Sequence, residues 1–579
     1  MPPDFSLNCQ QSLRALFAMN WLFGRYSVVF YATLATLAGA AWLIIDGPFN
    51  PWLMSSLALS SLLMVFGIQD YFQTGSAVRA NFPVLGRLRY FFESIRPELR
   101  QYFWEDDDAE LPYSRNQRAM VYQRAKSEFS IRAFGSIEAM YKEDFSWLNH
   151  SLAPLHIEAE DFRTWVGVGD QRYAISLLNI SGTSFGALSP PAIEALNLGA
   201  AQGQFAHNTG EGSVSPYHIK GGGDLILQVS TGYFGFRDAS GRLDRALFAQ
   251  KATQPQVKMI EIKLSQGAKP GHGGLLPAAK VTAEIALTRG IDEGVDCASP
   301  ASHAEFKTPQ ELLRFAAELR EISGGKPVGI KLCIGHPWEF IAIVKSMTEG
   351  EPLLDFISVD GAEGGTGAAP TEFSDHLGSP LTDALVFVDN TLRGAGLRSR
   401  IKIAASGKMI SAFDIVKHCA LGADWVNMAR PFMFALGCIQ ARNCASGLCP
   451  TGIATMDPTR YRVLDIETKA SRVRNFHQNT LKAVGELIGA AGIAHPVDLN
   501  RRHIVRRLSG SEILLADQIY PKVLDNQLFT DEPIADPRLA VYWHRVSGRS
   551  FAADDLQPAE ALPQAEAILR QPSGSKSHP

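Results

Sequence analysis

Two long apolar stretches stand near the start of the chain, separated by a short polar turn. The first, SVVFYATLATLAGAAWLII, covers 27–45 without a charge, and the second, PWLMSSLALSSLLMVFGI, covers 51–68. Each is long enough for a helix to cross a bilayer. The pattern predicts a two-helix transmembrane hairpin over 27–69. The alternative is a buried helical pair within a soluble protein.

Arginines flank this hairpin on both sides. Arg14 and Arg25 precede it, four more follow within 79–96, and the turn carries only Asp46. The positive-inside rule therefore places both ends in the cytoplasm. We expect a cytoplasmic segment over 1–26, a juxtamembrane helical connector over 70–150, and a cytoplasmic remainder of the chain.

From residue 174 onward, short strand-like runs alternate with segments of helical period. The strong candidates are AISLLNI, LILQVS, KMIEIKL, PVGIKLC, LLDFISVD, RIKIAAS and ADWVNMA, and the weaker ones are FAHNT and GVDCAS. Helical segments such as PQELLRFAAELREI and SAFDIVKHCALG lie between them. This order is typical of parallel strands joined by crossovers. We predict a (β/α)8 TIM-type barrel over 151–500 with one extra strand, and an open doubly wound sheet as the alternative. The remainder, 501–579, is expected to be an extension with a disordered tail.

Composition narrows the classes of function. The chain has 46% hydrophobic and 20% charged residues and a formal net charge of −4, which gives no case for nucleic-acid binding. Its 50 glycines gather in short clusters between apolar runs. Such clusters indicate loops that approach a ligand closely.

Glycine clusters follow several predicted strands. NISGTSFGALS carries Gly182 and Gly186, VDGAEGGTGAAP carries several more, SGK occupies 406–408, and Arg430 ends the next run. Loops and a helix start at strand ends commonly bind phosphate, because free amide groups and the helix dipole favour anions. We interpret the clusters as a site for a phosphate-bearing cofactor; the alternative is a set of tight turns.

Lysines also occur at strand ends. EIKLSQGAKPGHGG carries Lys263, Gln266 and Lys269, and IKLCIG carries Lys331. Together they indicate a cationic site suited to a dicarboxylate, although each alone could be a rim salt bridge. A lysine so placed could also form a Schiff base or stabilise an anionic reduced flavin.

Three of the seven cysteines crowd into GCIQARNCASGLCPTG: Cys438, Cys444 and Cys449. A disulfide is disfavoured in the reducing cytoplasm. Thiolates select iron–sulfur clusters or zinc, and zinc would need a fourth ligand such as His418. Three thiolates and the following Pro450 suit a cuboidal cluster lacking one iron. Ordinary buried cysteines remain the alternative.

In their order along 176–455, these motifs resemble the synthase domain of the glutamate synthase family. The motifs are SFGALS, HNTGEG, QVSTGYFG, IKLSQGAKPG, VDGAEGGTGA, SGK and CIQARNCASGLC. The hairpin and LGRLRYFFESIRPELRQYF resemble a membrane-anchored branch without a glutaminase domain. The resemblance implies an FMN-binding barrel and a 3Fe-4S cluster on the three cysteines. It implies FMN contacts for Ser184, Gly186, Gln228, Lys331, Asp360, Gly365, Ser406, Gly407, Lys408 and Arg430, and catalytic roles for Glu211, Lys263, Gln266 and Lys269. His272 is a further catalytic candidate that the resemblance does not supply.

The chemistry implied by the resemblance is reduction of 2-iminoglutarate to L-glutamate by hydride from reduced FMN. No G-x-G-x-x-G unit lies between a strand and a helix, so we expect electrons from a separate ferredoxin-like or reductase protein. Without a glutaminase segment, ammonia would come from solution or from another subunit.

Two positions depart from the family pattern KPGEGGQLP, because this chain reads KPGHGGLLP. Leu275 cannot hydrogen-bond a carboxylate, which weakens the assignment of 2-oxoglutarate. Histidine is a common proton donor in enzymes, so His272 is either a proton donor or an ordinary loop residue. Three other functions compete: an amino- or hydroxy-acid dehydrogenase feeding a membrane carrier, an electron-transfer subunit, and a flavin-free lyase using Lys331.

Overall fold

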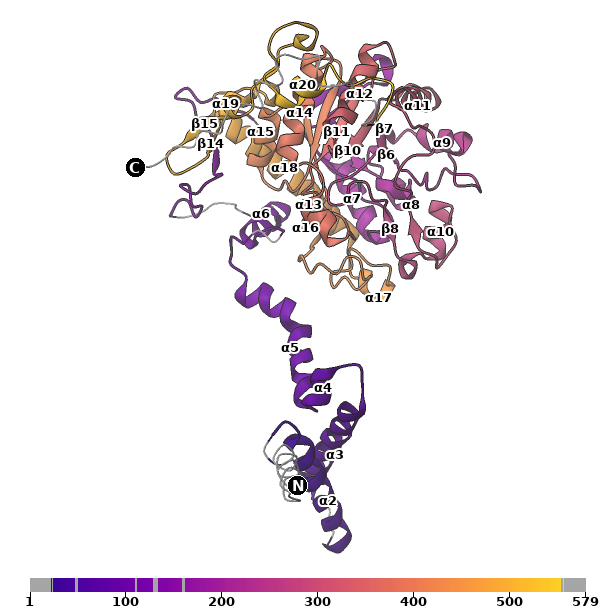
Figure 1. The fold of residues 1–579 in the computed structure, drawn as a ribbon, viewed down its shortest axis with the longest axis vertical. Helices are drawn as coiled ribbons and strands as arrows, with labels where there is room; N and C mark the ends of the chain where they lie inside the picture. Colours follow the sequence, from indigo (N-terminus) through magenta and orange to yellow (C-terminus); the bar gives the residue numbers. More distant parts are fainter. Residues whose placement is uncertain are drawn as a thin grey trace, which may run out of the picture. The chain divides into compact units, whose positions relative to one another are not determined.

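The computed structural model describes residue 22 and residues 24–46, 50–109, 112–128, 134–158, 162–552 and 556. The chain divides into two compact units, 1–109 and 110–579 (Figure 1). The expectations for most of 1–26, for the turn at 47–49 and for the tail after 556 lie outside the described residues.

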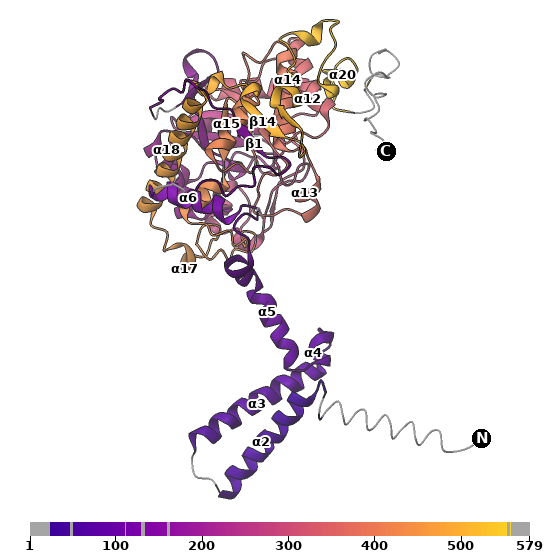
Figure 2. The ribbon, with the colours of Figure 1, turned by 90° about the vertical axis from the view of Figure 1, so that its left-hand side faces the viewer.

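The first unit contains the two predicted apolar helices, α2 (Ser27–Asp46) and α3 (Pro51–Phe72), which lie side by side (Figure 2). Gly67 allows this close packing, since a Cβ there would lie 2.4 Å from Val29 Cγ2. Both helices are long and apolar enough to cross a membrane, with mean hydropathies of 2.0 and 1.7. Only 11% of each span is buried, which does not fit a helical pair in a soluble core.

Short helices follow this hairpin: α4 (Ala77–Asn81), α5 (Leu85–Leu99) and the π-helix η1 (Arg100–Trp104). Asp70, buried near the end of α3, pairs with Arg79 (3.8 Å) and Arg87 (2.7 Å). These ion pairs hold the chain leaving α3 against the start of α5.

The second unit is built on a closed barrel of eight parallel strands, which confirms the predicted TIM-type fold and excludes the open sheet. Around the barrel the strands are β4 (Leu178–Ile180), β5 (His207–Asn208), β6 (Leu225–Val229), β7 (Val257–Lys263), β10 (Val328–Leu332), β11 (Phe356–Asp360), β12 (Lys402–Ser406) and β13 (Trp425–Met428). The weak candidate FAHNT supplies β5. The other, GVDCAS, supplies β9 (Cys297–Ala298), which pairs with β8 (Leu275–Leu276) outside the barrel.

One predicted strand is divided in two. The run AISLLNI forms β3 (Tyr173–Ser176), which pairs antiparallel with β2 (Arg163–Val166), and then β4 of the barrel. The change of partner occurs at Leu177, whose amide donates to the carbonyl of Phe162 (2.8 Å). Because buried residues continue without a break across this change, from Ile175 to Ile180, the hydrophobic pattern alone does not reveal it.

Helices cover the outside of the barrel (Figure 1). The predicted helix over 309–322 is α11 (Pro309–Ile322), whose capping box joins Thr308 and Glu311, and the one over 411–422 is α15 (Ala412–Ala420). The other barrel helices are α7 (Pro190–Gly203), α8 (Pro216–Lys220), α9 (Arg245–Ala252), α10 (Ala283–Arg289), α12 (Pro337–Thr348), α13 (Thr371–His376), α14 (Leu381–Gly394) and α16 (Arg430–Leu436).

Segments that precede and follow the barrel in the sequence pack onto it. Before it come α6 (Arg115–Lys126) and β1 (Ser146–Leu148), and after it come α17 (Pro458–Tyr461), α18 (Ile466–Ala490), β14 (Ile504–Arg507), β15 (Ile513–Leu515), α19 (Ala516–Ile519) and α20 (Pro537–Tyr542). The long helix α18 packs against α7 and α6.

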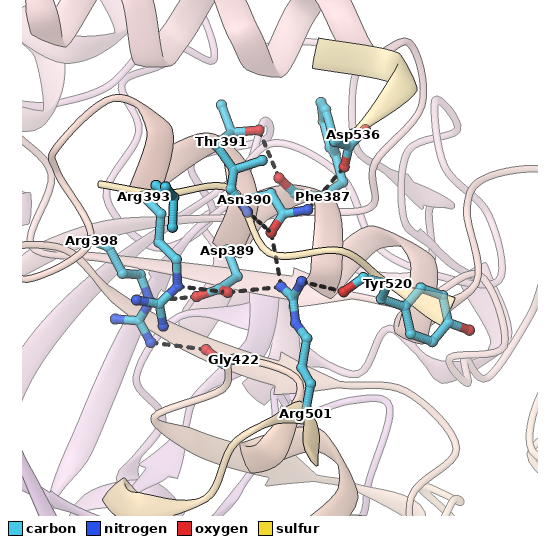
Figure 3. A network of polar contacts seen from close by, with 12 residues as sticks. Phe387, Asp389, Asn390, Thr391, Arg393, Arg398, Gly422, Arg501, Tyr520 and Asp536 are labelled. Carbon is cyan, nitrogen blue, oxygen red and sulfur yellow. Dashed lines mark hydrogen bonds and ion pairs between the residues drawn. The ribbon is translucent and has the colours of Figure 1, made fainter. Parts of the chain in front are cut away.

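A buried charge network joins the C-terminal extension to α14 (Figure 3). Asp389 is 2% exposed and accepts from Arg393, Arg398 and Arg501, each at 2.9 Å. Arg501 also donates to Asn390 Oδ1 (3.0 Å) and to the carbonyls of Tyr520 and Pro521. The network satisfies every charge that it buries, which is the condition for buried ions to be tolerated.

Candidate active site

One cavity of about 470 Å³ opens where all eight barrel strands end. Residues at or just after the carboxyl end of each strand line it, which is where barrel enzymes place their chemistry. Of the predicted site residues, the lining includes Glu211, Lys263, Gln266, Lys269, Ser184, Gln228, Lys331, Asp360, Gly365, Ser406, Gly407, Lys408, Arg430, Cys438, Cys444 and Cys449.

Two predicted site residues do not line the cavity. His272 is exposed, with its ring 5.4 Å from that of Phe373, so its role as a proton donor stays a prediction. Gly186 has φ +101°, and a Cβ there would lie 3.1 Å from Leu276 Cδ2. Gly186 therefore shapes the loop behind the cavity wall.

One part of the cavity, which we call the substrate end, contains Glu211, Lys263, Gln266, Lys269, Leu275, Leu276 and Pro277. Lys263 Nζ donates to Glu211 Oε2 at 2.9 Å. Burial alone would raise the pKa of Glu211, but Lys263, Arg289 and Lys269 together lower it to about 2. Glu211 is thus ionised at neutral pH and neutralises Lys263.

Lys269 differs from Lys263. Its side chain is 3% exposed, and it makes no hydrogen bond or ion pair with any residue that the structure describes. Burial lowers its pKa below the usual 10.5. Glu211 acts on this ammonium electrostatically and partly opposes the effect of burial, but it makes no direct ion pair with it, so the ammonium can bind an anionic group of a ligand.

Polar side chains also project into the barrel below the cavity. Glu261 is 1% exposed, and its Oε1 accepts from Gln228 Nε2 and from Asn208 Nδ2, both at 2.7 Å. Lys331 Nζ lies 3.3 Å from Asp360 Oδ2. Burial would lower the pKa of Lys331, but Asp360 and Glu261 raise it, so its ammonium is charged.

The opposite part of the cavity is formed by the loops after β11, β12 and β13. Gly365 lets the backbone approach Arg430, because a Cβ there would lie 2.7 Å from Arg430 Nε. Gly407 has φ +151°, and Lys408 is left-handed with φ +39°. Asn427 Oδ1 is buried here without a hydrogen-bond partner, an orphan that a ligand donor could satisfy.

The three clustered cysteines face the same cavity. Burial raises the pKa of Cys438 to about 12 and that of Cys444 above 9.0, whereas hydrogen bonds to Thr451 and the nearby backbone outweigh burial and lower that of Cys449. Within the described ranges, no three His, Cys, Asp or Glu side chains lie close enough to hold one metal ion. His418 is absent from the lining and bonds to the carbonyl of Asp414 (2.7 Å).

Residues that the sequence did not single out support the cysteine loop. The Lys280 ammonium bonds to the carbonyls of Cys444 (2.6 Å) and Ala454 (3.3 Å). The Gln440 side chain brackets the backbone of Tyr113, accepting from its amide (3.2 Å) and donating to its carbonyl (2.9 Å).

Tyr113 precedes α6, in the segment expected to be a connector. Its ring lines the cavity, packs on Phe434 and lies 4.9 Å from the Arg430 guanidinium. No motif marks Tyr113 as part of a site. Only the return of this segment to the barrel brings it there.

Arg289 on α10 was also missed. It is 2% exposed and donates to the carbonyl of Phe185 (3.0 Å), with Cys297 Sγ at 3.5 Å. It lowers the pKa of Glu211 from behind the cavity wall. A lone arginine in a helical sequence gives no signal for such a position.

This chain is similar in sequence to known proteins of one family. The family model for the conserved region in glutamate synthase matches residues 141–494. The glutamate synthase large subunit-like protein YerD of Bacillus subtilis (strain 168) is 36% identical over 494 residues, covering 78% of this chain and 94% of its own length. The NADPH archaeal glutamate synthase of Methanocaldococcus jannaschii is 39% identical over 315 residues, covering 54% of this chain and 58% of its own length.

Similarity to solved structures is weaker. A mandelate oxidase mutant with the monooxide FMN adduct is 14% identical, covering 74% of this chain and 99% of that chain, with a TM-score of 0.37. The family model and the relatives together show that the chain belongs to the glutamate synthase family and is an oxidoreductase of the class that acts on CH–NH2 donors.

Proposed function

We propose that this protein is a membrane-anchored, FMN- and iron–sulfur-dependent oxidoreductase that reduces a 2-imino or 2-oxo acid. The model reaction is the reduction of 2-iminoglutarate to L-glutamate, with electrons from a separate protein. One observation carries the proposal. A single cavity is lined by the buried Lys269, by Arg430 with Gly365 packed close beside it, and by the three clustered cysteines.

The residues present fit FMN. Gly365 and Gly407 leave backbone space beside Arg430 and Lys408, which would hold the phosphate. Deeper in the barrel, Gln228, Lys331 and the unsatisfied Asn427 Oδ1 offer polar contacts for an isoalloxazine ring. The cavity volume lies in the range usual for cofactor sites, roughly 300–1,000 Å³.

The donor set also fits an iron–sulfur cluster better than zinc. A structural zinc ion almost always takes four protein ligands, and His418, the fourth ligand considered from the sequence, is not in the cavity lining. Two of the three have raised pKa values, so binding to metal would supply the positive charge that stabilises their thiolates. We propose that Cys438, Cys444 and Cys449 hold a 3Fe-4S cluster, which would pass electrons singly to the flavin.

Reduced FMN would supply a hydride to C2 of the imino acid, turning its C=N bond into the C–N bond of an amine. The protein's own groups orient that substrate. Lys269 binds a carboxylate, and Gln266 can donate to it. Lys331 keeps a positive charge in the cavity lining, which would favour the anionic reduced form of a flavin bound there.

The direct test is anaerobic turnover in detergent. The full chain is first reduced with dithionite and then freed of excess reductant. A 2-oxo acid plus ammonium should reoxidise it, with one molecule of amino acid formed per two electrons. Reoxidation that forms neither the amino acid nor the 2-hydroxy acid, or no reoxidation by any 2-oxo acid, contradicts the proposal. The variant Lys269→Met should lose the reaction while it keeps its flavin.

The apolar hairpin favours a second candidate at the same site: oxidation of an amino acid, with electrons passed to a membrane carrier. In this direction the C2 hydride reduces the flavin, and the nitrogen loses a proton. Bleaching of the oxidised flavin by an L-amino acid, reversed by a quinone analogue, would favour this direction.

The two remaining alternatives fit the site less well. An electron-transfer subunit needs no unpaired lysine in a substrate end. A Schiff-base lyase needs an uncharged lysine as nucleophile, but the carboxylates around Lys331 raise its pKa.

A further inference from the structure

The substrate end of the cavity has an apolar wall beside its charged groups. Leu275, Leu276 and Pro277 line it in sequence, and they come from β8 and the residue that follows. Leu276 is 6% exposed and Leu275 is 44% exposed. The wall is fixed by pairing with β9, where Leu275 lies opposite Ala298.

This wall lies directly beside the ion pair of the site. A Cβ on Gly274 would lie 2.0 Å from Glu211 Oε1, so the residue before Leu275 has its backbone against that carboxylate. Glu211 in turn holds Lys263 at 2.9 Å. A ligand that reaches these lysines therefore also reaches the leucines.

At the substrate end, one positively charged side chain is available to a ligand. Lys263 is neutralised by Glu211, which its neighbours keep ionised. The Arg289 guanidinium is held by the carbonyl of Phe185 and does not line the cavity. Lys269 remains, buried and without a partner in the described part of the chain.

We infer that the substrate is a 2-oxo or 2-imino acid with one carboxylate and an apolar side chain, such as that of a branched-chain amino acid. Lys269 binds the carboxylate, and the side chain lies against Leu275–Pro277. A second carboxylate at the end of that side chain, as in 2-oxoglutarate, would be desolvated against leucine side chains, which offer no hydrogen-bond donor, and this is costly. The inference rests on the proposed function and replaces its model substrate.

The experiment is a binding titration, independent of turnover. The probes are 4-methyl-2-oxopentanoate and 2-oxoglutarate, added to the oxidised, flavin-containing full chain in detergent while the flavin spectrum is recorded. We expect the branched monocarboxylate to bind at least ten times more tightly. Tighter or equal binding of 2-oxoglutarate, or no response to either acid, overturns the inference. A chain that carries no flavin instead refutes the proposed function itself.

Variants sharpen the test. Leu275→Gln adds an amide to the wall and should shift the ratio of the two affinities at least tenfold toward 2-oxoglutarate. Leu275→Met keeps the wall apolar and should keep the preference. The matched control is Leu287→Gln on α10, where the side chain is 85% exposed and outside the cavity, and it should leave the ratio unchanged. An unchanged ratio in Leu275→Gln overturns the inference.

Discussion

At the scale of single residues, the decisive feature is the difference between two neighbouring lysines. Lys263 has a counter-ion at 2.9 Å, whereas Lys269 is more deeply buried and makes no side-chain hydrogen bond or ion pair with any described residue. Sequence motifs place both at the end of one strand, but they cannot say which lysine is neutralised. That depends on Glu211, which comes from a different strand.

The first prediction concerns pH. Burial lowers the pKa of Lys269, so its ammonium loses the proton at a lower pH than an ordinary lysine with a pKa of 10.5. Binding of a carboxylate ligand should therefore be strong at low pH and weaken as pH rises, at values below 10.5. Flavin difference spectra at each pH measure this. Lys269→Arg should extend binding to higher pH, and the same weakening in Lys269→Arg would argue against the assignment.

The second prediction concerns Glu261, a positioning residue. Because its carboxylate can only accept, Gln228 must donate through Nε2 and direct its Oε1 elsewhere. Glu261→Gln should allow the Gln228 amide to turn over, and it removes a negative charge near Lys331. We expect FMN to bind about tenfold more weakly, the loss of roughly one hydrogen bond, and the flavin midpoint potential to rise. Glu194→Gln, on α7, is the control; equal effects of the two variants would refute the role.

At the scale of elements, the strands and helices of the barrel follow from their apolar runs. The helical period of the apolar residues predicted a helix over 309–322, which are the bounds of α11. The glycine-rich loops marked the ends of several strands. The pattern failed where two strands share one apolar run, at Leu177, and where a distant segment returns to the barrel, at Tyr113. Both failures concern long-range pairing, which local periodicity does not encode.

The extension after the barrel gives the third prediction. Arg501→Met removes one of the three guanidinium groups around Asp389 and the bonds to the Tyr520 and Pro521 carbonyls (Figure 3). Buried groups left without partners should lower the free energy of unfolding by about 2–4 kcal/mol. Urea denaturation measures the change. Arg502→Met is the matched control, because that side chain is 80% exposed and should cost less than about 0.5 kcal/mol.

At the scale of the whole molecule, the fourth prediction tests the anchor. If α2 and α3 span a bilayer, the full chain should stay in the membrane pellet after alkaline carbonate extraction. Leu37→Arg with Leu59→Arg should release it, because each charge costs about 2.5–3.5 kcal/mol at a helix centre. Arginine substitutions at Leu152 and Leu287, which are exposed in the second unit, should leave the chain in the membrane pellet. Extraction of the unaltered chain would contradict the anchor.

The central claim is that one cavity holds both a flavin and an iron–sulfur cluster. The measurement is the visible absorption spectrum of the detergent-purified full chain before and after dithionite, with iron and sulfide assayed on the same sample. We predict a flavin spectrum over a broad iron–sulfur shoulder, both bleached by the reductant, and about three irons per chain. A colourless protein, or one with flavin but neither iron nor sulfide after anaerobic purification, would contradict the account.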